Sequence, residues 1–388
     1  MTQENSAAAI PEIESLAERA AGPARFPLPD GRTVWVVGDN AHVRTVLSDP
    51  RFSADDQQPG YPRLLPLPLE PGGLSFLRMD PPRHDVLRRV LTPVFTMRRI
   101  EALRGPVTRL ARELLGTLRA AGPPADLVAG FALPLPSQVI CLLLGVPYAD
   151  RAMFQHHSGV ILSFDATGEE AGESMAALGA YLGELAAAKR AHPGEDLLSQ
   201  AVRRQEATGM SDADVTAMAR LMLVAGHETT ANMIGLAVLT LFREPERQAA
   251  LRADPELIKP AVEELLRFLS VVRAGIGRVA LEDVPLTDEV TVRAGEGVVF
   301  SLRSANHDPA AFADPGTLDF GRDARGHLAF GYGVHQCLGQ ALARLELQIA
   351  LRELLAEFPD LRSARPPEEI RVRDRTLVAG VESLPVVW

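Results

Sequence analysis

One long segment without proline constrains the fold more than any other feature of this sequence. It follows Ser211, continues to Pro245, and opens on Ser-Asp-Ala-Asp at 211–214, which resembles a helix capping box. At 1.5 Å per residue it predicts a helix about 50 Å long. Residues 221–241 are apolar nearly all round, whereas a surface helix keeps a polar face. The segment therefore predicts a helix that runs through the core of one large α-rich domain.

The other patterns are mostly helical, and strands are confined to short runs. Helical patterns dominate residues 85–280, and a further helix with one apolar face should follow Cys337. Runs typical of strands lie at residues 33–37, 290–293, 297–302 and 377–387. The sequence therefore predicts a mainly α fold with small peripheral β-sheets.

Charge and cysteine content exclude several classes of protein. Forty basic against fifty acidic residues give a net charge of −10, which argues against a sequence-wide attraction to nucleic acid or anionic lipid. The two cysteines, Cys141 and Cys337, are too few for a disulfide framework, a four-cysteine zinc site or an iron–sulfur cluster. The first thirty residues are too charged for a signal peptide or membrane anchor, so a cytoplasmic protein is expected.

An uncharged stretch at residues 127–148 is long enough to cross a bilayer. Pro134, Pro136 and Pro147 should break it as a helix. We therefore interpret it as buried protein core, and no association with a membrane is expected.

The most informative short segment surrounds Cys337 and reads Phe-Gly-Tyr-Gly-Val-His-Gln-Cys-Leu-Gly over residues 330–339. The cysteine precedes a predicted helix, whose main-chain N–H groups and positive end should stabilise a thiolate and lower its pKa. The glycines would let the backbone pass close to a large flat group. A single thiolate in such a loop is what haem iron needs for oxygen activation. The alternative is a buried structural cysteine, which is our interpretation of Cys141 in its apolar surroundings.

This segment resembles the haem loop of the cytochrome P450 superfamily, F-G-x-G-x-H-x-C-x-G, and fills every fixed position. The resemblance spans roughly residues 52–351 and looks like that of soluble actinobacterial members of secondary metabolism. It implies haem b with the Cys337 thiolate as axial iron ligand, and Phe330, Gly331 and Gly339 beside it. It also implies the cytochrome P450 fold as a single haem-thiolate domain over residues 1–388. The haem would lie between the long central helix and the helix after the cysteine.

Within the predicted long helix, residues 225–230 read Ala-Gly-His-Glu-Thr-Thr. Glycine is unfavourable in a helix interior and threonine hydroxyls can bond back to the preceding turn, so one interpretation is a bent core helix. An acid beside an alcohol can also serve as a proton relay. The segment resembles the superfamily pattern A/G-G-x-D/E-T-T/S. The resemblance implies catalytic roles in proton delivery for Glu228 and Thr229, and places Ala225 beside the haem.

Glu264 and Arg267 stand three residues apart and should share a helix face. As a bare pair they would form a solvated surface bridge. The resemblance implies instead the buried structural ion pair that the superfamily forms with E-x-x-R. Its third member would come from the loop before the haem segment, where both Arg322 and His327 are candidates.

The superfamily also anchors the haem propionates with cations, because charge-assisted hydrogen bonds suit carboxylates. The resemblance implies this role for His84, Arg88, Arg278 and His335. For each of them, an ordinary surface charge is the alternative.

These features together imply a haem-thiolate monooxygenase that takes up O₂ and electrons and inserts one oxygen atom into a lipophilic substrate. No Rossmann-type G-x-G-x-x-G follows a strand, and the chain has 51 residues after Cys337, too few for a flavin domain. We therefore expect electrons from a ferredoxin and its NAD(P)H-dependent reductase. An oxidase of the same fold that performs ring closure, desaturation or coupling is the first alternative. A non-catalytic haem- or ligand-binding module is the second, and a helical protein without haem the third.

Two parts of the chain are expected to contact other molecules: one forms the substrate pocket and the other docks the electron donor. The candidate pocket walls include the Pro- and Gly-rich loop within 58–76 and the residues Phe76, Val224, Ala225, Val272, Ile276 and Val378. Their apolar or small side chains suggest a sizeable polyketide, macrolide or terpenoid. Residues 81–112 hold eight arginines against two acids, a net charge of +6. The resemblance places this segment on the cysteine side of the haem, where it should dock an acidic ferredoxin; a solvated helix face is the alternative. A monomer is expected.

Overall fold

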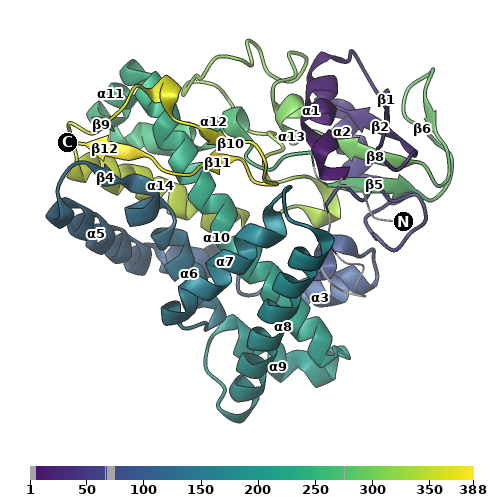
Figure 1. The fold of residues 1–388 in the computed structure, drawn as a ribbon, viewed down its shortest axis with the longest axis horizontal. Helices are drawn as coiled ribbons and strands as arrows, with labels where there is room; N and C mark the ends of the chain where they lie inside the picture. Colours follow the sequence, from purple (N-terminus) through teal and green to yellow (C-terminus); the bar gives the residue numbers. More distant parts are fainter. Residues whose placement is uncertain (1–5, 66, 68–74, 275) are drawn as a thin grey trace.

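The predicted long helix is present as α10 (Asp212–Arg243), which passes through the helical part of the molecule (Figure 1). The structure is a computed structural model that describes residues 6–65, 67, 75–274 and 276–388. At the start of α10 the Ser211 hydroxyl accepts the N–H of Asp214, while the Asp214 carboxylate accepts the N–H of Ser211. This capping box satisfies main-chain donors that the first turn would otherwise leave unpaired.

Shorter helices make up most of the remaining fold, and α6, α8, α12 and α14 pack against α10. The shorter helices are α1 (Ile10–Arg19), α2 (Asn40–Ser48), α3 (Arg83–Leu91), α4 (Met97–Ala102), α5 (Arg104–Ala121), α6 (Pro134–Leu144), α7 (Arg151–Leu162), α8 (Gly168–Ala191), α9 (Leu197–Thr208), α11 (Pro245–Ala253), α12 (Ile258–Leu269), α13 (Leu302–Asn306) and α14 (Gln340–Glu357). Single helical turns include η2 (Ser75–Arg78), the π-helical η3 (Val128–Ala132) and η6 (Gly333–His335). Among the described residues no helix has the length and apolar character needed to cross a membrane.

The strands form small sheets at the periphery, as predicted. The largest in the described part has the order β1 (Ala24–Pro27), β2 (Thr33–Val37), β8 (Gly297–Phe300), β5 (Gly277–Ala280) and β3 (Phe52–Ser53). In it β2 and β8 run parallel and the other neighbours antiparallel. The smaller sheets are β10 (Val372–Arg373) with β11 (Gly380–Val381), β4 (Ala125–Asp126) with β12 (Pro385–Val387) and β9 (Arg362–Ser363), and β6 (Val284–Pro285) with β7 (Thr291–Val292).

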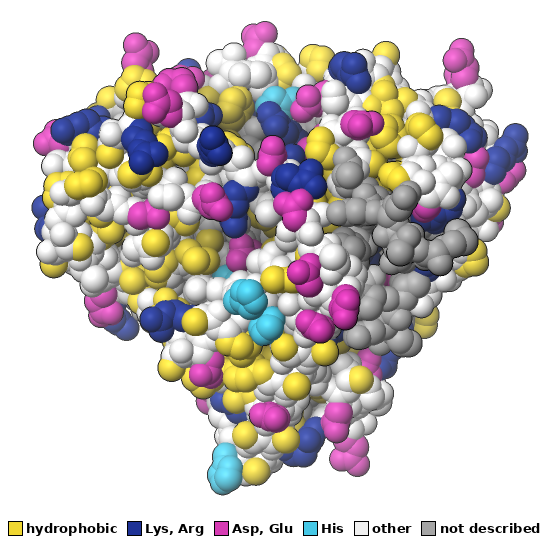
Figure 2. Space-filling view, viewed as in Figure 1, with side chains coloured by type: hydrophobic (Ala, Val, Ile, Leu, Met, Phe, Trp, Pro, Cys, Tyr) yellow, Lys and Arg dark blue, Asp and Glu magenta, His cyan; other side chains and the backbone are white. Residues whose placement is uncertain are grey.

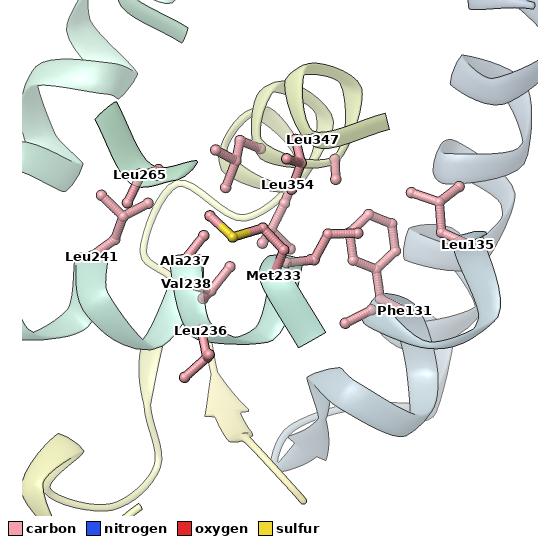
Figure 3. Packing of buried hydrophobic residues seen from close by; sticks show 14 of the residues in the cluster. Phe131, Leu135, Met233, Leu236, Ala237, Val238, Leu241, Leu265, Leu347 and Leu354 are labelled. Atoms are coloured by element: carbon pink, nitrogen blue, oxygen red, sulfur yellow. The ribbon is translucent and has the colours of Figure 1, made fainter. Parts of the chain in front are cut away.

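The core lies where α10 packs against helices on two sides (Figure 3). Met233, Ala237 and Leu241 of α10 contact a cluster that includes Phe131 and Leu135 on one side, and residues of α12 and α14 on the other. Residues 127–148 contribute to this core, so their interpretation as buried protein is confirmed. The prediction that no single helix spans this stretch is confirmed, since α6 begins at Pro134 and ends at Leu144, before Pro147. Pro134 and Pro136 lie in the first turn of α6, where proline is tolerated because those N–H groups have no partner in the helix.

The surface carries charges of both signs. On the face shown in Figure 2, acidic and basic side chains are interspersed with apolar ones. Together with the net charge of −10, this mixture gives no support to a nucleic-acid-binding surface on that face.

Candidate haem and oxygen-activation site

A cavity of about 280 Å³ lies between α10 on one side and the loop before Cys337 with helix α14 on the other. From α10 it is lined by Ala225, Gly226, Thr229, Thr230 and Met233; from the opposite side by Phe330, Gly331, Cys337, Gly339, Leu342, Ala343, Glu346 and Leu347. The residues predicted beside the haem, Ala225, Phe330, Gly331 and Gly339, therefore face one space. This space lies between the two helices that the resemblance implied.

The loop that carries Cys337 is held close to α2. Gly333 has a φ of +71°, and a Cβ atom there would lie 2.4 Å from the main-chain oxygen of Leu47, so only glycine fits. The Cys337 N–H donates to the Phe330 carbonyl over 2.9 Å, which turns the loop back on itself just before α14. Cys337 is exposed and lines the cavity. Within the described residues, no group of three or more His, Cys, Asp or Glu side chains is placed so that it could hold a metal ion.

The prediction of a lowered thiol pKa at Cys337 is wrong. Burial raises the pKa of Cys337, and the N–H groups of Gly339 and Gln340 and the charges of Arg88 and Arg344 offset only part of this rise. The sequence predicts where the helix begins but not how far the sulfur atom is buried. Coordination to iron deprotonates a thiol outright, so a metal supplies the charge that burial otherwise opposes.

The predicted propionate anchors lie together beside the cavity. Arg88, Arg278 and His335 line the cavity. The ring centroids of His84 and His335 lie 4.5 Å apart. Arg88 donates to the Gln336 carbonyl over 2.5 Å. Burial, with the charges of Arg278, His84 and Arg88 beside it, lowers the pKa of His335 to about 3.

Arg78, which the sequence analysis missed, joins this group. Its guanidinium lies 5.0 Å from the Tyr61 ring centroid, and its burial, with Arg278 nearby, lowers its pKa to about 10. No motif singled it out, because its burial depends on Tyr61 from another segment. Among the described residues, Nε and Nη1 of Arg78, Nε2 of His84 and Nδ1 of His335 have no hydrogen-bond partner. Buried donors without acceptors are unfavourable, so these residues fit a flat group with two carboxylates at one edge, as haem has.

On α10 the structure separates the two predicted relay residues. Thr229 lines the cavity and its hydroxyl donates back to the Ala225 carbonyl over 2.7 Å. Glu228 is buried on another face of the helix, where its Oε1 lies 3.6 Å from His227 Nε2 and its Oε2 accepts from Asn232 Nδ2 over 3.2 Å. Burial alone would raise the pKa of Glu228, but His227, Arg373 and Asn232 together lower it, so the group is a carboxylate.

Glu264 and Arg267 form a buried ion pair, and both side chains have zero exposure. Two parallel hydrogen bonds of 2.8 Å join the guanidinium to the carboxylate. Of the two candidates for the third member, Arg322 is the one that reaches Glu264, with Nε 3.1 Å from Oε1. His327 contacts Glu263 instead, over 3.2 Å.

The predicted substrate pocket is formed in part. Phe76, Ala225, Val272 and Ile276 line the cavity, whereas Val224 and Val378 are buried and do not. Val378 forms an isolated β-bridge with Val272 and so supports the wall from behind. Within the predicted loop at 58–76, residues 66 and 68–74 lie outside the described residues.

Glu346 is a second residue that the sequence analysis missed. It lines the cavity from α14, its side chain is 1% exposed, and its Oε2 has no hydrogen-bond partner among the described residues. Burial raises its pKa well above the usual range. Burial therefore favours the protonated carboxyl in the folded protein, since no paired charge offsets its desolvation.

Replacing Glu346 with glutamine should remove a pH dependence of stability. The folded protein holds a proton on Glu346 that the unfolded chain loses above its ordinary pKa, so stability falls as the pH rises from about 4.3, by up to about 1.4 kcal/mol per pH unit. Glu346→Gln has no such proton. Thermal unfolding of the holoprotein is measured from pH 5 to 8. The unfolding midpoint of Glu346→Gln should rise relative to that of the wild type as the pH rises. Glu353→Gln, on the same helix, controls for loss of an acid, and parallel curves for Glu346→Gln would contradict the assignment.

Comparisons with known proteins agree with the site. The family model for Cytochrome P450 matches residues 183–371. The chain is 50% identical to Cytochrome P450-SU2 of Streptomyces griseolus over 366 residues, 94% of this chain and 90% of that protein. The crystal structure of the putative thioether synthase SgvP, involved in the tailoring step of griseoviridin, matches with a TM-score of 0.91 and 40% identity, covering 100% of this chain and 98% of that one. That of mycinamicin VIII C21 methyl hydroxylase MycCI from Micromonospora griseorubida matches with a TM-score of 0.89 and 39% identity, covering 100% and 99%.

Proposed function

The chain belongs to the cytochrome P450 family of haem-thiolate oxidoreductases, and we propose that it inserts one oxygen atom from O₂ into a sizeable lipophilic secondary metabolite. The observation that carries this proposal is that Cys337 and Thr229 face one apolar cavity from opposite sides. When bound, haem supplies oxygen activation, in which two electrons and two protons leave one oxygen atom for the substrate and one for water. We assign residues 1–388 to a single domain, because helices from both halves of the chain share the core around α10.

In this proposal the Cys337 thiolate would hold the haem iron. Arg78, His84, Arg88, Arg278 and His335 would hold the propionates. Arg78, His84 and His335 keep buried nitrogen atoms without a partner among the described residues, and Arg88 and Arg278 bring positive charge to the cavity. Phe330, Gly331 and Gly339 would flank the haem on the cysteine side, and Ala225 on the other.

Thr229 and Glu228 have different roles in proton delivery. The Thr229 hydroxyl uses its hydrogen on the Ala225 carbonyl, so its oxygen remains free to accept from a water molecule in the cavity. The Glu228 carboxylate takes a proton from solvent and returns it to that water, which regenerates the carboxylate. Thr229 thus orders the donor and Glu228 replenishes it.

The lining of the cavity supports a lipophilic substrate. Phe76, Leu77, Val272 and Ile276 bring apolar surface to it, and Thr229 and Thr230 are its polar side chains on α10. Apolar walls with few polar groups suit a neutral, largely hydrocarbon molecule. The name of MycCI, a methyl hydroxylase, supports oxygen insertion; that of SgvP, a putative thioether synthase, favours the second candidate, an oxidase without net oxygen insertion.

Thr229→Ala tests the oxygen-insertion proposal. We expect the variant to bind substrate and accept electrons, but to form several-fold less product per NAD(P)H and more hydrogen peroxide, because protons no longer arrive in order. Product, NAD(P)H and peroxide are measured in the same reaction. Thr240→Ala, a buried threonine of α10 that does not line the cavity, serves as the control. A product ratio equal to that of wild type would exclude the relay role of Thr229.

We further propose that a ferredoxin delivers the electrons to the basic segment at residues 81–112. Three of its arginines are already paired: Arg83 with Asp214, Arg104 with Glu101 and Arg112 with Glu353. Arg89, Arg98, Arg99 and Arg109 are exposed and have no ion pair within the described part of the chain. Arg98 and Arg99 belong to α4, which packs against α14, the helix that follows the cysteine. An acidic partner docked there would lie on the cysteine side of the haem.

Charge reversal of Arg98 and Arg99 to glutamate should slow reduction by ferredoxin at low ionic strength. The effect should shrink as salt is added, because steering between exposed charges is screened. Turnover driven by hydrogen peroxide should be unchanged. The matched control is reversal of Arg362 and Arg365, an exposed pair in and beside β9. Equal losses in both assays would assign Arg98 and Arg99 to folding or haem retention instead of docking.

A further inference from the structure

Two neighbouring acids of α12, Glu263 and Glu264, have different partners. Glu264 belongs to the buried pair with Arg267. Glu263 instead accepts two hydrogen bonds from Arg344 of α14, from Nε over 2.7 Å and from Nη2 over 3.0 Å. Burial alone would raise the pKa of Glu263, but His327 and Arg344 lower it to about 2, so Glu263 is a carboxylate.

The Arg344 guanidinium is held by two further contacts. Its Nη1 donates to the side-chain oxygen of Gln340 over 2.9 Å, and its Cζ lies 4.5 Å from the centroid of the Phe330 ring. A guanidinium is planar, so two bonds to one carboxylate together with an aromatic ring fix its orientation as well as its position. The charge of Arg344 therefore has a defined place next to Phe330.

This place is beside the loop that carries the sulfur. Phe330 lines the cavity, and its carbonyl accepts the N–H of Cys337 over 2.9 Å. Burial raises the pKa of Cys337, and the charges of Arg88 and Arg344 both oppose this rise. Arg88 lines the cavity with the candidate propionate anchors, whereas Arg344 is not among the described residues that line it. Arg344 is thus the cation that acts on the sulfur from outside the cavity.

His327 connects Glu263 to the same loop. Its Nε2 lies 3.2 Å from Glu263 Oε2, and its Nδ1 accepts the Ala329 N–H over 3.1 Å. The Glu263 carboxylate is therefore held both by α14 and by the segment before Phe330. Its negative charge stays next to Arg344 and offsets part of the field of the guanidinium at the sulfur.

We propose that Arg344 is a positioning residue whose charge limits the electron density that the Cys337 thiolate gives to the haem iron, and that Glu263 weakens this effect by partly neutralising Arg344. A cation near the sulfur stabilises negative charge on the sulfur itself, so less of it passes to the iron. A carboxylate beside that cation acts in the opposite direction. This inference rests on the haem-thiolate site of the proposed function and adds the ion pair that tunes it.

The first test is the midpoint reduction potential of the holoenzyme, measured by spectroelectrochemistry without turnover. Arg344→Gln should lower the potential, because loss of a nearby cation favours the ferric state, and Glu263→Gln should raise it. The double variant Arg344→Gln/Glu263→Gln removes no net charge and should return close to the wild-type potential. Arg344→Lys keeps the charge and should show most of the wild-type behaviour. Damage to packing alone would move both single variants in one direction, and the double variant at least as far.

The second test is the infrared C–O stretching frequency of the reduced carbon-monoxide complex, which falls when the iron passes more electron density to the ligand. It should be lower in Arg344→Gln and higher in Glu263→Gln. The matched controls are Arg112→Gln and Glu353→Gln, which break an exposed pair on the same helix and should change neither readout. If Arg344→Gln does not retain haem, the upward shifts expected for Glu263→Gln decide the question. Shifts of one sign in both variants, or no shift while the thiolate-type band is intact, would overturn the role of Arg344. Absence of that band from the wild type would instead overturn the proposed function.

Discussion

Cys337→Ser should abolish the red-shifted, thiolate-type absorption of the reduced carbon-monoxide complex. The band depends on a sulfur anion as axial ligand, and serine offers an alkoxide precursor that stays protonated near pH 7. The structure adds that loss of the band should not come from collapse of the site. Cys337 follows a loop fixed by main-chain contacts, the Cys337 N–H to Phe330 and Gly333 against Leu47, which a serine side chain leaves in place. The measurement is the difference spectrum of the reduced protein with and without carbon monoxide.

Cys141→Ser is the matched control for this experiment. Cys141 is buried in α6, where burial raises the pKa of its thiol to about 12, and it lies in the hydrophobic cluster beside α10. The band should therefore persist in Cys141→Ser, with a modest loss of stability from a polar group placed in the core. If Cys141→Ser lost the band and Cys337→Ser kept it, the assignment of the ligand would be wrong.

The cysteine loop and the long helix could be predicted because their evidence is local. The capping box at Ser211, the absence of proline up to Pro245 and the apolar surface of residues 221–241 are all visible in one stretch of sequence, and α10 ends at Arg243 as expected. Strand pairing is different. The partners β2 and β8 are adjacent in the sheet but far apart in the chain, and β10 and β11 have two residues each, too few for a period to be seen.

What the sequence did not predict at the site depends on burial, which neighbours from distant segments create. Arg78 becomes a candidate anchor because Tyr61 covers it, and Glu346 is unusual because nothing pairs with its Oε2 among the described residues. The pKa of Cys337 was predicted from the helix start, yet desolvation outweighs that effect. Similarly, Arg322 and His327 are equivalent candidates in sequence, and only the course of their loop brings Arg322 to Glu264.

The Glu264–Arg267 pair is where one substitution should have the largest effect on stability. Besides its two bonds to Glu264, the Arg267 guanidinium donates to the carbonyls of Asn306 and Pro315 over 2.8 and 2.9 Å. It therefore ties α12 to the end of α13 and to the loop that leads toward the cysteine segment. Both charged groups are without exposure, so neither can recover water if its partner is removed.

Arg112→Ala is the matched control for this site, since it breaks an arginine–glutamate pair in which the arginine side chain is 68% exposed. An exposed pair contributes about 0–1 kcal/mol, so Arg112→Ala should be soluble and carry a full complement of haem. Arg267→Lys separates charge from geometry. Lysine restores the positive charge but cannot make the paired bonds to Glu264 together with those to Asn306 and Pro315, so we expect only partial rescue.

Arg267→Ala should yield apoprotein or aggregate, because it leaves the Glu264 carboxylate buried with Arg322 as its remaining cation and strips the Asn306 and Pro315 carbonyls of a donor. Removing one partner of a buried pair costs about 3–5 kcal/mol, a large part of the stability of most folded proteins. The effect should reach the haem through the loop before Cys337, so haem content per purified chain and the unfolding midpoint should fall together. A soluble Arg267→Ala protein that is fully loaded with haem and unfolds like Arg112→Ala would show that the pair is dispensable.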